Sequence, residues 1–97
     1  MNLFDYTAPN RGESFTTLLE HEKVKVVRIV SSDRFESIEY VQEEEEWVVL
    51  LEGSATLLLD KEEKYLKKGD ILLIPARTPH KILEMQQGTL WLALHIF

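Results

Sequence analysis

A histidine that could do chemistry follows a proline-braced bend in the second half of the chain. Residues 69–80 read Gly-Asp-Ile-Leu-Leu-Ile-Pro-Ala-Arg-Thr-Pro-His, which predicts a turn at Gly69, an apolar strand and a stiff bend. Such a bend can aim the imidazole of His80, and imidazole binds transition metals or transfers protons near neutral pH. The alternative is a histidine that starts a strand and makes one hydrogen bond.

A carboxylate is the second candidate, at the end of a run of four glutamates. Residues 43–45 fit a solvated loop. Glu46 opens an apolar strand and, if its side chains alternate, shares a face with Val48 and Leu50. A carboxylate on that face requires a cation or hydrogen-bond donors, because burying it alone is costly. The alternative is a glutamate at a strand end in water.

The third candidate is His95, on the last strand. Trp91, Ala93 and His95 share one face of this strand, and the other face is purely apolar. The apolar face is expected to form the core, which would direct His95 outward or into a subunit interface. The small side chain of Ala93 instead leaves room for a cavity, in which case His95 is a ligand or pocket residue. The remaining candidate, His21, lies in a polar turn and is expected in solvent.

Composition predicts one small globular domain. The 97 residues suffice for a single core, and 17 acidic against 11 basic residues give a net charge of −6. This sign disfavours nucleic acid as a partner. The absence of cysteine excludes a disulfide, a thiolate nucleophile and cysteine-bound zinc. No signal peptide and no apolar run of the roughly 20 residues that span a bilayer are found, so a cytoplasmic protein without a membrane partner is expected.

Short strands separated by turns account for most of the chain. They are expected at residues 24–30, 37–42, 47–51, 55–59, 64–66, 71–74, 81–83 and 89–97. The run 71–74 is expected to be buried on both faces. Residues 14–20 fit a short helix or a strand equally well. The spacing predicts an all-β domain, closed or built from two sheets, over residues 1–97.

Two of these features together resemble the cupin superfamily. Glu46, six further residues and Gly53 are similar to the second half of the first cupin motif. Gly69, five residues, Pro75 and a histidine five residues later, His80, are similar to the second motif. The resemblance covers about residues 36–84 directly.

The resemblance implies a single-domain cupin barrel of jelly-roll type, a double-stranded β-helix. Cupins often bind one divalent metal through a His-x-His pair and a glutamate of the first motif and a histidine of the second. On this pattern Glu46 and His80 match ligand positions. The His-x-His pair is missing, because Tyr40-x-Gln42 stands in its place.

One interpretation is therefore a metal site. Its expected metal ligands are Glu46 and His80, with Gln42 or His95 completing the shell and Tyr40 near the substrate. The metal would be Fe, Ni, Mn, Cu or Zn, although an amide is a poorer ligand for these ions than imidazole.

The other interpretation is a metal-free site for a small organic ligand. Arg77 carries a fixed charge that would oppose a metal cation but could hold an anion. His80 and Tyr40 would then form hydrogen bonds, or act as acid and base in an isomerisation. His95 belongs to the expected binding residues in both interpretations.

Three functions stay open at this point: a metal-dependent enzyme, a metal-free small-molecule-binding protein, and a barrel whose dimer surface is the working part. Both faces of the last strand are largely apolar, so the second face requires cover, which another copy of the chain could provide. Small cupins are commonly homodimers, and the resemblance therefore also implies a homodimer.

Overall fold

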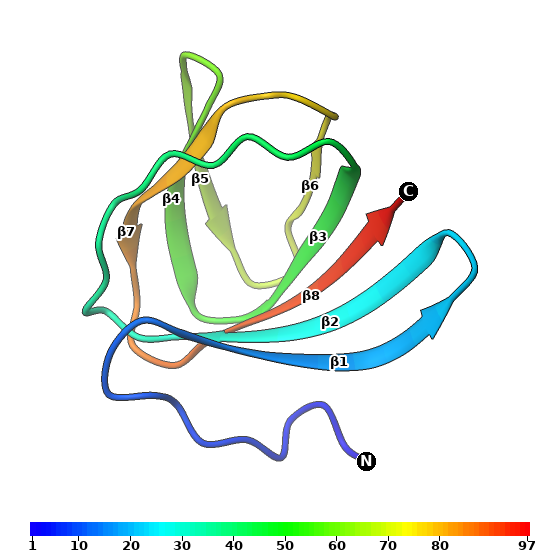
Figure 1. The fold of residues 1–97 in the computed structure, drawn as a ribbon. Coiled ribbons are helices and arrows are strands. Elements are labelled where there is room, and N and C mark those ends of the chain that lie inside the picture. The colour runs from blue at the N-terminus through cyan, green and yellow to red at the C-terminus, as the bar shows by residue number, and fades with distance from the viewer.

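The structure is a computed structural model that describes all residues, 1–97, and contains eight strands (Figure 1). They are β1 (Glu13–His21), β2 (Val24–Ser31), β3 (Glu45–Glu52), β4 (Ser54–Leu59), β5 (Glu62–Lys67), β6 (Ile71–Ile74), β7 (His80–Met85) and β8 (Thr89–Ile96). No helix is long and apolar enough to cross a membrane.

Two antiparallel sheets enclose the core. One has five strands in the order β1-β2-β8-β3-β6, and the other has three in the order β5-β4-β7. Figure 1 shows the two sheets curving around a common interior. The largest buried apolar cluster lies between them and consists of Val48, Leu50, Ala55, Leu57, Leu66, Met85, Trp91 and Ala93. The all-β jelly-roll prediction is confirmed.

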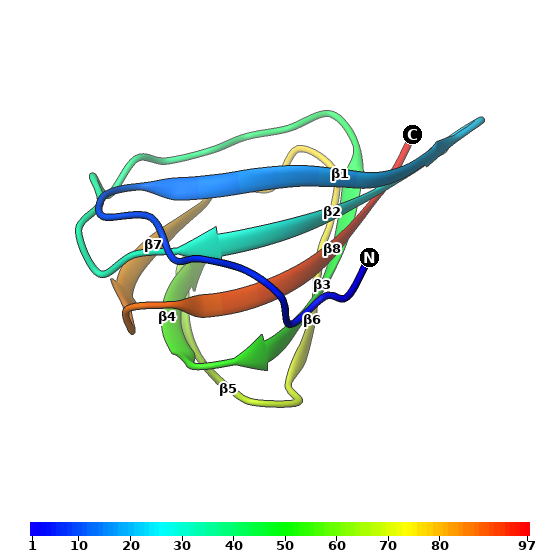
Figure 2. The same ribbon diagram turned by 90° about the horizontal axis from the view of Figure 1, so that it is seen from below.

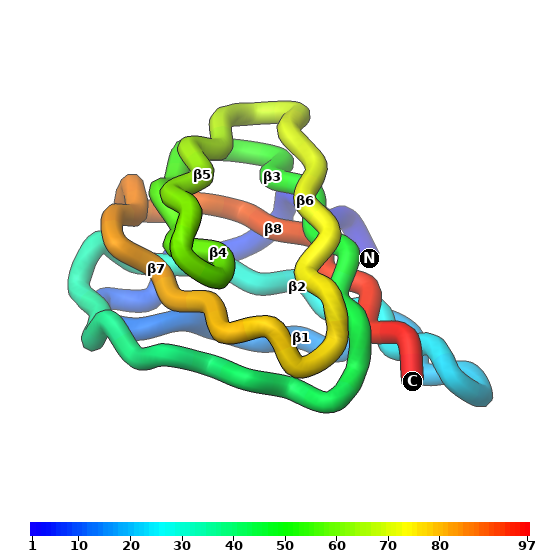
Figure 3. Tube along the Cα trace, turned by 90° about the horizontal axis from the view of Figure 1, so that it is seen from above, coloured from blue at the N-terminus to red at the C-terminus, as the bar shows by residue number.

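Three predicted elements are settled or corrected. Residues 14–20 belong to strand β1. Residues 37–42 do not form a strand, but lie in the connection between β2 and β3, which runs beside β7 and makes one bridge, Tyr40 to His80 (Figure 3). The expectation that residues 71–74 are buried on both faces is wrong. Ile71 and Leu73 are 58% and 48% exposed, because β6 is an edge strand whose outer face is uncovered.

The two faces of β8 are the reverse of what the apolar pattern predicts. Trp91 and Ala93 are 4% and 0% exposed and point into the barrel. Leu92 and Leu94 point outward and are only half-buried. His95 lies on the same inner face as Trp91 and Ala93 and places a polar side chain at the cavity inside the barrel.

The N-terminal segment crosses the outside of the five-stranded sheet (Figure 2). Arg28 of β2 points outward, and its Nη1 donates to the backbone carbonyls of Asn2, Leu3 and Asp5 at 3.1–3.4 Å. The hydroxyl of Tyr6 donates to a carbonyl in the β7–β8 turn at 3.0 Å. This segment therefore covers one part of the outer face and leaves the rest open.

The β3–β4 hairpin requires glycine. Gly53 has φ of +92°, and a Cβ there would lie 2.9 Å from the Cα of Thr89. Such an approach is too close for a side chain. Gly53, the glycine of the first motif, therefore permits the tight turn between β3 and β4. Glu46 lies at the other end of β3.

Candidate functional site

A cavity of about 230 Å³ lies inside the barrel between the two sheets. Five of the six residues predicted to form a site line it: Tyr40, Gln42, Glu46, His80 and His95. Its other walls are mostly apolar and are formed by Phe15, Ile29, Val48, Leu57, Ile74, Ile82 and Trp91. The cavity thus combines an apolar body with a few polar groups, which is typical of small-molecule sites.

Backbone hydrogen bonds hold the β2–β3 connection against the bend before β7. Tyr40 and His80 exchange N–H···O bonds of 2.8 and 2.9 Å. The amide of Arg77 donates to the carbonyl of Gln42 at 2.7 Å. Arg77 has φ of +57° and forms the bend between the two prolines. This clamp brings Tyr40 and Gln42 to the same cavity as His80.

His80 is held in one tautomer. Its Nδ1 lies 3.0 Å from the carbonyl oxygen of Thr78. A carbonyl only accepts, so Nδ1 carries the proton and Nε2 of the neutral ring is an acceptor. The stiff bend that the sequence predicts thus delivers an oriented imidazole.

Glu46 is the most deeply buried carboxylate of the cavity, with a side chain 9% exposed. Its Oε1 accepts a hydrogen bond of 2.9 Å from Nε2 of Gln42. Because the amide nitrogen must donate to the carboxylate, the amide oxygen of Gln42 is left as a free acceptor. Gln42 thus supplies one of the hydrogen-bond donors that a buried carboxylate such as Glu46 requires.

His95 lies between two carboxylates. Its Nδ1 is 3.0 Å from Oε2 of Glu44, and its Nε2 is 3.9 Å from Oε2 of Glu46. The first distance is a hydrogen bond and the second is too long for one. Glu44 was expected in a solvated loop, but its side chain is only 18% exposed and orients His95.

Glu13, at the start of β1, is a cavity residue that the sequence did not predict. Its Oε2 accepts a hydrogen bond from the hydroxyl of Ser31, which in turn accepts one from Nε1 of Trp91 at 3.2 Å. Burial raises the pKa of the Glu13 carboxyl above its ordinary value, the bond from Ser31 opposes this rise, and the charge of Glu46 adds to it. The ambiguous pattern of residues 14–20 hid this carboxyl, because its direction follows only once the segment is known to be a strand.

Arg77 is the one predicted site residue that the fold does not bring to the cavity. Its side chain is 70% exposed and lies 3.7 Å from Oε2 of Glu43. The bend turns this side chain outward, so the expectation that Arg77 holds an anion in the pocket has no support in the geometry.

The polar groups do not fit a transition metal as they are arranged. Nowhere in the chain do three histidine or acidic side chains come together in a way that could hold a metal ion. Gln42 donates its N–H to Glu46, so the only ligand atom that it leaves for a metal is the amide oxygen, a poorer ligand than imidazole for these ions. Among the histidine nitrogens and carboxylate oxygens of the cavity, the closest pair, Nε2 of His95 and Oε2 of Glu46, is 3.9 Å apart.

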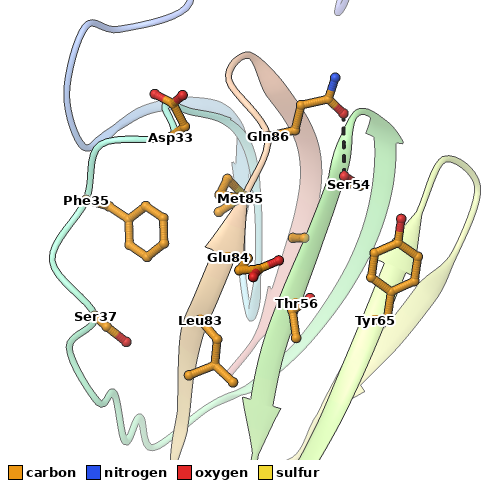
Figure 4. A pocket seen from close by; sticks show the side chains of 11 residues that line it. Asp33, Phe35, Ser37, Ser54, Thr56, Tyr65, Leu83, Glu84, Met85 and Gln86 are labelled. Atoms are coloured by element: carbon orange, nitrogen blue, oxygen red, sulfur yellow. Dashed lines mark hydrogen bonds between the residues drawn. The ribbon is translucent and has the colours of Figure 1, made fainter.

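A second concavity of about 560 Å³ lies between the β2–β3 connection and the three-stranded sheet (Figure 4). Thr56, Tyr65 and Glu84 are cross-strand neighbours on this surface, and Phe35 and Ser37 face them from the connection. None of the predicted site residues lines it. The barrel cavity, where histidines and buried carboxylates meet, is therefore the candidate site.

Comparison with known proteins places this geometry in a family. Residues 26–93 match the family model described as cupin domain. A crystal structure of a candidate mannose-6-phosphate isomerase from Ralstonia eutropha JMP134 is similar to 99% of this chain and 95% of its own, at 30% identity and a TM-score of 0.88.

Two further proteins are similar to this chain. A cupin superfamily protein from Desulfitobacterium hafniense DCB-2 superposes with a TM-score of 0.82 at 20% identity, over 95% of this chain and 84% of its own. An uncharacterised protein of Methanocaldococcus jannaschii is 50% identical over 38 residues, 39% of this chain. That match spans only 30% of the archaeal protein's length.

We predict that Glu13 makes stability fall as pH rises. Below its ordinary pKa of 4.5 the carboxyl is neutral in both folded and unfolded chains. Between the ordinary pKa and the raised pKa of the folded state, the carboxyl is ionised in the unfolded chain but still protonated in the folded chain. Ionisation therefore stabilises the unfolded state, and wild type loses stability relative to Glu13→Gln until the carboxyl is ionised in both states. Urea unfolding of both proteins between pH 4 and 8, at one protein concentration, measures this difference.

The control is Glu62→Gln. Lys64 lowers the pKa of this exposed carboxyl through a hydrogen bond, so its difference curve should be smaller and of opposite sign. A flat curve for Glu13→Gln, or one in which wild type gains stability with pH, would contradict the role given to Glu13.

Proposed function

This chain belongs to the cupin family, and from that membership and its cavity we propose that it binds a small organic molecule inside the barrel without a resident metal ion. One observation carries the proposal. Side chains from four separate segments, the β2–β3 connection, β3, β7 and β8, meet at one cavity: Tyr40, Gln42, Glu46, His80 and His95.

The orientation of these groups supports ligand binding. His80 has a fixed tautomer with a free acceptor, and Glu46 keeps one oxygen without a hydrogen-bond partner. Fixed polar groups beside an apolar wall orient a ligand, while the wall contributes burial. Trp91 is anchored by Ser31 and gives the cavity a rigid aromatic side.

A phosphorylated sugar does not suit this cavity. Phosphate groups are bound by arginine, lysine or several N–H donors. Here Glu13 and Glu46 face the cavity, and Arg77 pairs with Glu43 outside it. The isomerase name of the similar Ralstonia protein is therefore not part of the proposal.

Thermal unfolding with a panel of metabolites tests the proposal. We expect at least one small, partly apolar compound to raise the Tm of wild type, by roughly 10 °C at about 100 times its Kd. His80→Ala should weaken that compound's binding about tenfold, since it removes one oriented hydrogen bond.

His21→Ala is the matched control, because His21 is exposed in the β1–β2 hairpin and does not line the cavity. It should respond as wild type does, and mannose 6-phosphate and inorganic phosphate should shift neither protein. The proposal fails if no compound stabilises the protein, or if His80→Ala binds as well as wild type.

The absence of a resident metal has its own test. We expect wild type incubated with Fe²⁺, Ni²⁺, Mn²⁺, Cu²⁺ or Zn²⁺ and then desalted to retain well below one equivalent by elemental analysis. Gln42→His should raise retention of the imidazole-preferring ions, because it places a third nitrogen or oxygen donor beside Glu46 and near His80.

Gln42→Ala is the control, since it removes the amide without adding a ligand. Nearly one equivalent of metal in wild type, lost in His80→Ala, would overturn the metal-free proposal and restore the metal-site interpretation.

We further propose that the chain forms a homodimer through the open part of the outer face of the five-stranded sheet. One row of outward-facing residues crosses all five strands and is apolar throughout: Leu19, Val26, Leu94, Trp47 and Leu73. Exposed apolar rows of this kind are typical of interfaces, and a two-fold axis lets one such face cover its own copy.

Leu94→Glu tests the dimer. It places a charge at the middle of this row, where burial in an interface would be costly. Light scattering after gel filtration should give twice the chain mass for wild type and the chain mass for Leu94→Glu. Tyr65→Glu, at a position of β5 in the other sheet that is 66% exposed, is the control and should stay dimeric. A monomeric wild type would refute the dimer and leave the cavity proposal intact.

A further inference from the structure

The barrel cavity is rich in hydrogen-bond acceptors that have no partner within the chain. His80 contributes Nε2, because its Nδ1 donates to Thr78. Glu46 contributes Oε2 and Gln42 its amide oxygen, because their other polar atoms bond to each other. Glu13 contributes Oε1, because only its Oε2 is bonded to Ser31.

Two carboxylates give the cavity a negative charge. Glu13 and Glu46 both line it and are close enough for the charge of Glu46 to act on Glu13. Lys81 is the only lysine or arginine among the lining residues. It follows His80, which faces inward at the start of β7, so strand alternation directs the lysine side chain outward. Inside the cavity strand alternation thus leaves no lysine or arginine side chain between the carboxylates, and Nε2 of His95 lies 3.9 Å from Oε2 of Glu46, too far for a hydrogen bond.

Three aromatic residues complete this environment. Phe15, Tyr40 and Trp91 line the same cavity. The faces of aromatic rings attract cations, and this attraction is strongest where water is excluded. An anionic ligand would be repelled by the two carboxylates, and a neutral ligand would lack the charge-assisted hydrogen bonds and the cation–π attraction that a cation gains here.

A ligand that matches these walls carries both positive charge and several N–H donors. A metal ion would supply the charge, but the donor geometry does not fit one. We propose that the ligand of this cavity is a small amine, whose primary ammonium group binds to the carboxylates of Glu46 and Glu13 while its apolar part lies on the aromatic wall. This inference rests on the proposed function and names the ligand class for it.

A set of four matched probes tests this assignment: butylamine, butanol, butyrate and tetramethylammonium. Each is titrated at pH 7 and constant ionic strength into ¹⁵N-labelled full-length protein, and the amide resonances of cavity-lining residues report binding. We expect butylamine to bind at least about tenfold more tightly than butanol, because it adds charge-assisted hydrogen bonds. Butyrate should bind more weakly than butanol, and tetramethylammonium, which has no N–H donor, more weakly than butylamine.

Two isosteric variants locate the ammonium group. Glu46→Gln and Glu13→Gln should each weaken butylamine about tenfold and change butanol binding less than twofold. Glu63→Gln, which neutralises an exposed carboxylate of β5, is the control and should leave both affinities unchanged. Because the two carboxylates lie on different strands, folding failure of one variant leaves the other as a test.

The outcomes separate this inference from the proposed function. If butanol or butyrate binds the cavity as tightly as butylamine, the ammonium assignment is wrong while small-molecule binding stands. Equal binding of tetramethylammonium would also overturn it, since N–H donation would then be irrelevant. If none of the four probes perturbs the cavity resonances, the assignment fails, and the metabolite panel alone decides the proposed function.

Discussion

The site depends on the backbone clamp between the β2–β3 connection and the bend before β7. The connection forms no strand, and its position follows from the paired bonds of Tyr40 with His80 and the bond from the Arg77 amide to Gln42. These bonds, together with that from the Ser37 hydroxyl to the carbonyl of Ile82, fix Tyr40 and Gln42 relative to His80. Two prolines and the left-handed conformation of Arg77 shape the bend, so backbone stiffness there positions side chains of two segments, the β2–β3 connection and β7.

Burial of Glu46 sets the chemistry of the cavity that this clamp creates. A carboxylate in such a position requires compensation, and the chain provides only part of it, through one bond from Gln42 and the neighbouring ring of His95. Glu13 increases the need for compensating positive charge or hydrogen-bond donors, because the charges of Glu13 and Glu46 repel each other. A bound cation would satisfy both groups. The chain's own groups therefore compensate these two carboxylates only in part, through Gln42, Ser31 and the ring of His95.

Sequence patterns predicted the parts of the fold whose signals are local. The turn at Gly69, the apolar run and His80 were found from spacing, and Glu46 from its strand position. The predictions failed where the direction of a side chain depends on how its strand pairs with other strands. The largely apolar side of β8 faces outward because Trp91 and Ala93, on its other side, pack into the core between the two sheets. Glu13 escaped notice because its neighbours fit a helix and a strand equally well, and tertiary pairing with β2 decides between them.

The residue at position 42 links these observations. A histidine there would offer a lone pair to a metal, and a carboxylate and two further imidazoles lie around the same cavity. A glutamine instead turns its amide nitrogen to Glu46 and leaves an oxygen acceptor. The same scaffold would thus change from donating electron pairs to a metal into accepting N–H bonds from an organic cation. The barrel, the clamp and the orientation of His80 are common to both uses, which explains why the cupin fold alone does not determine what this cavity binds.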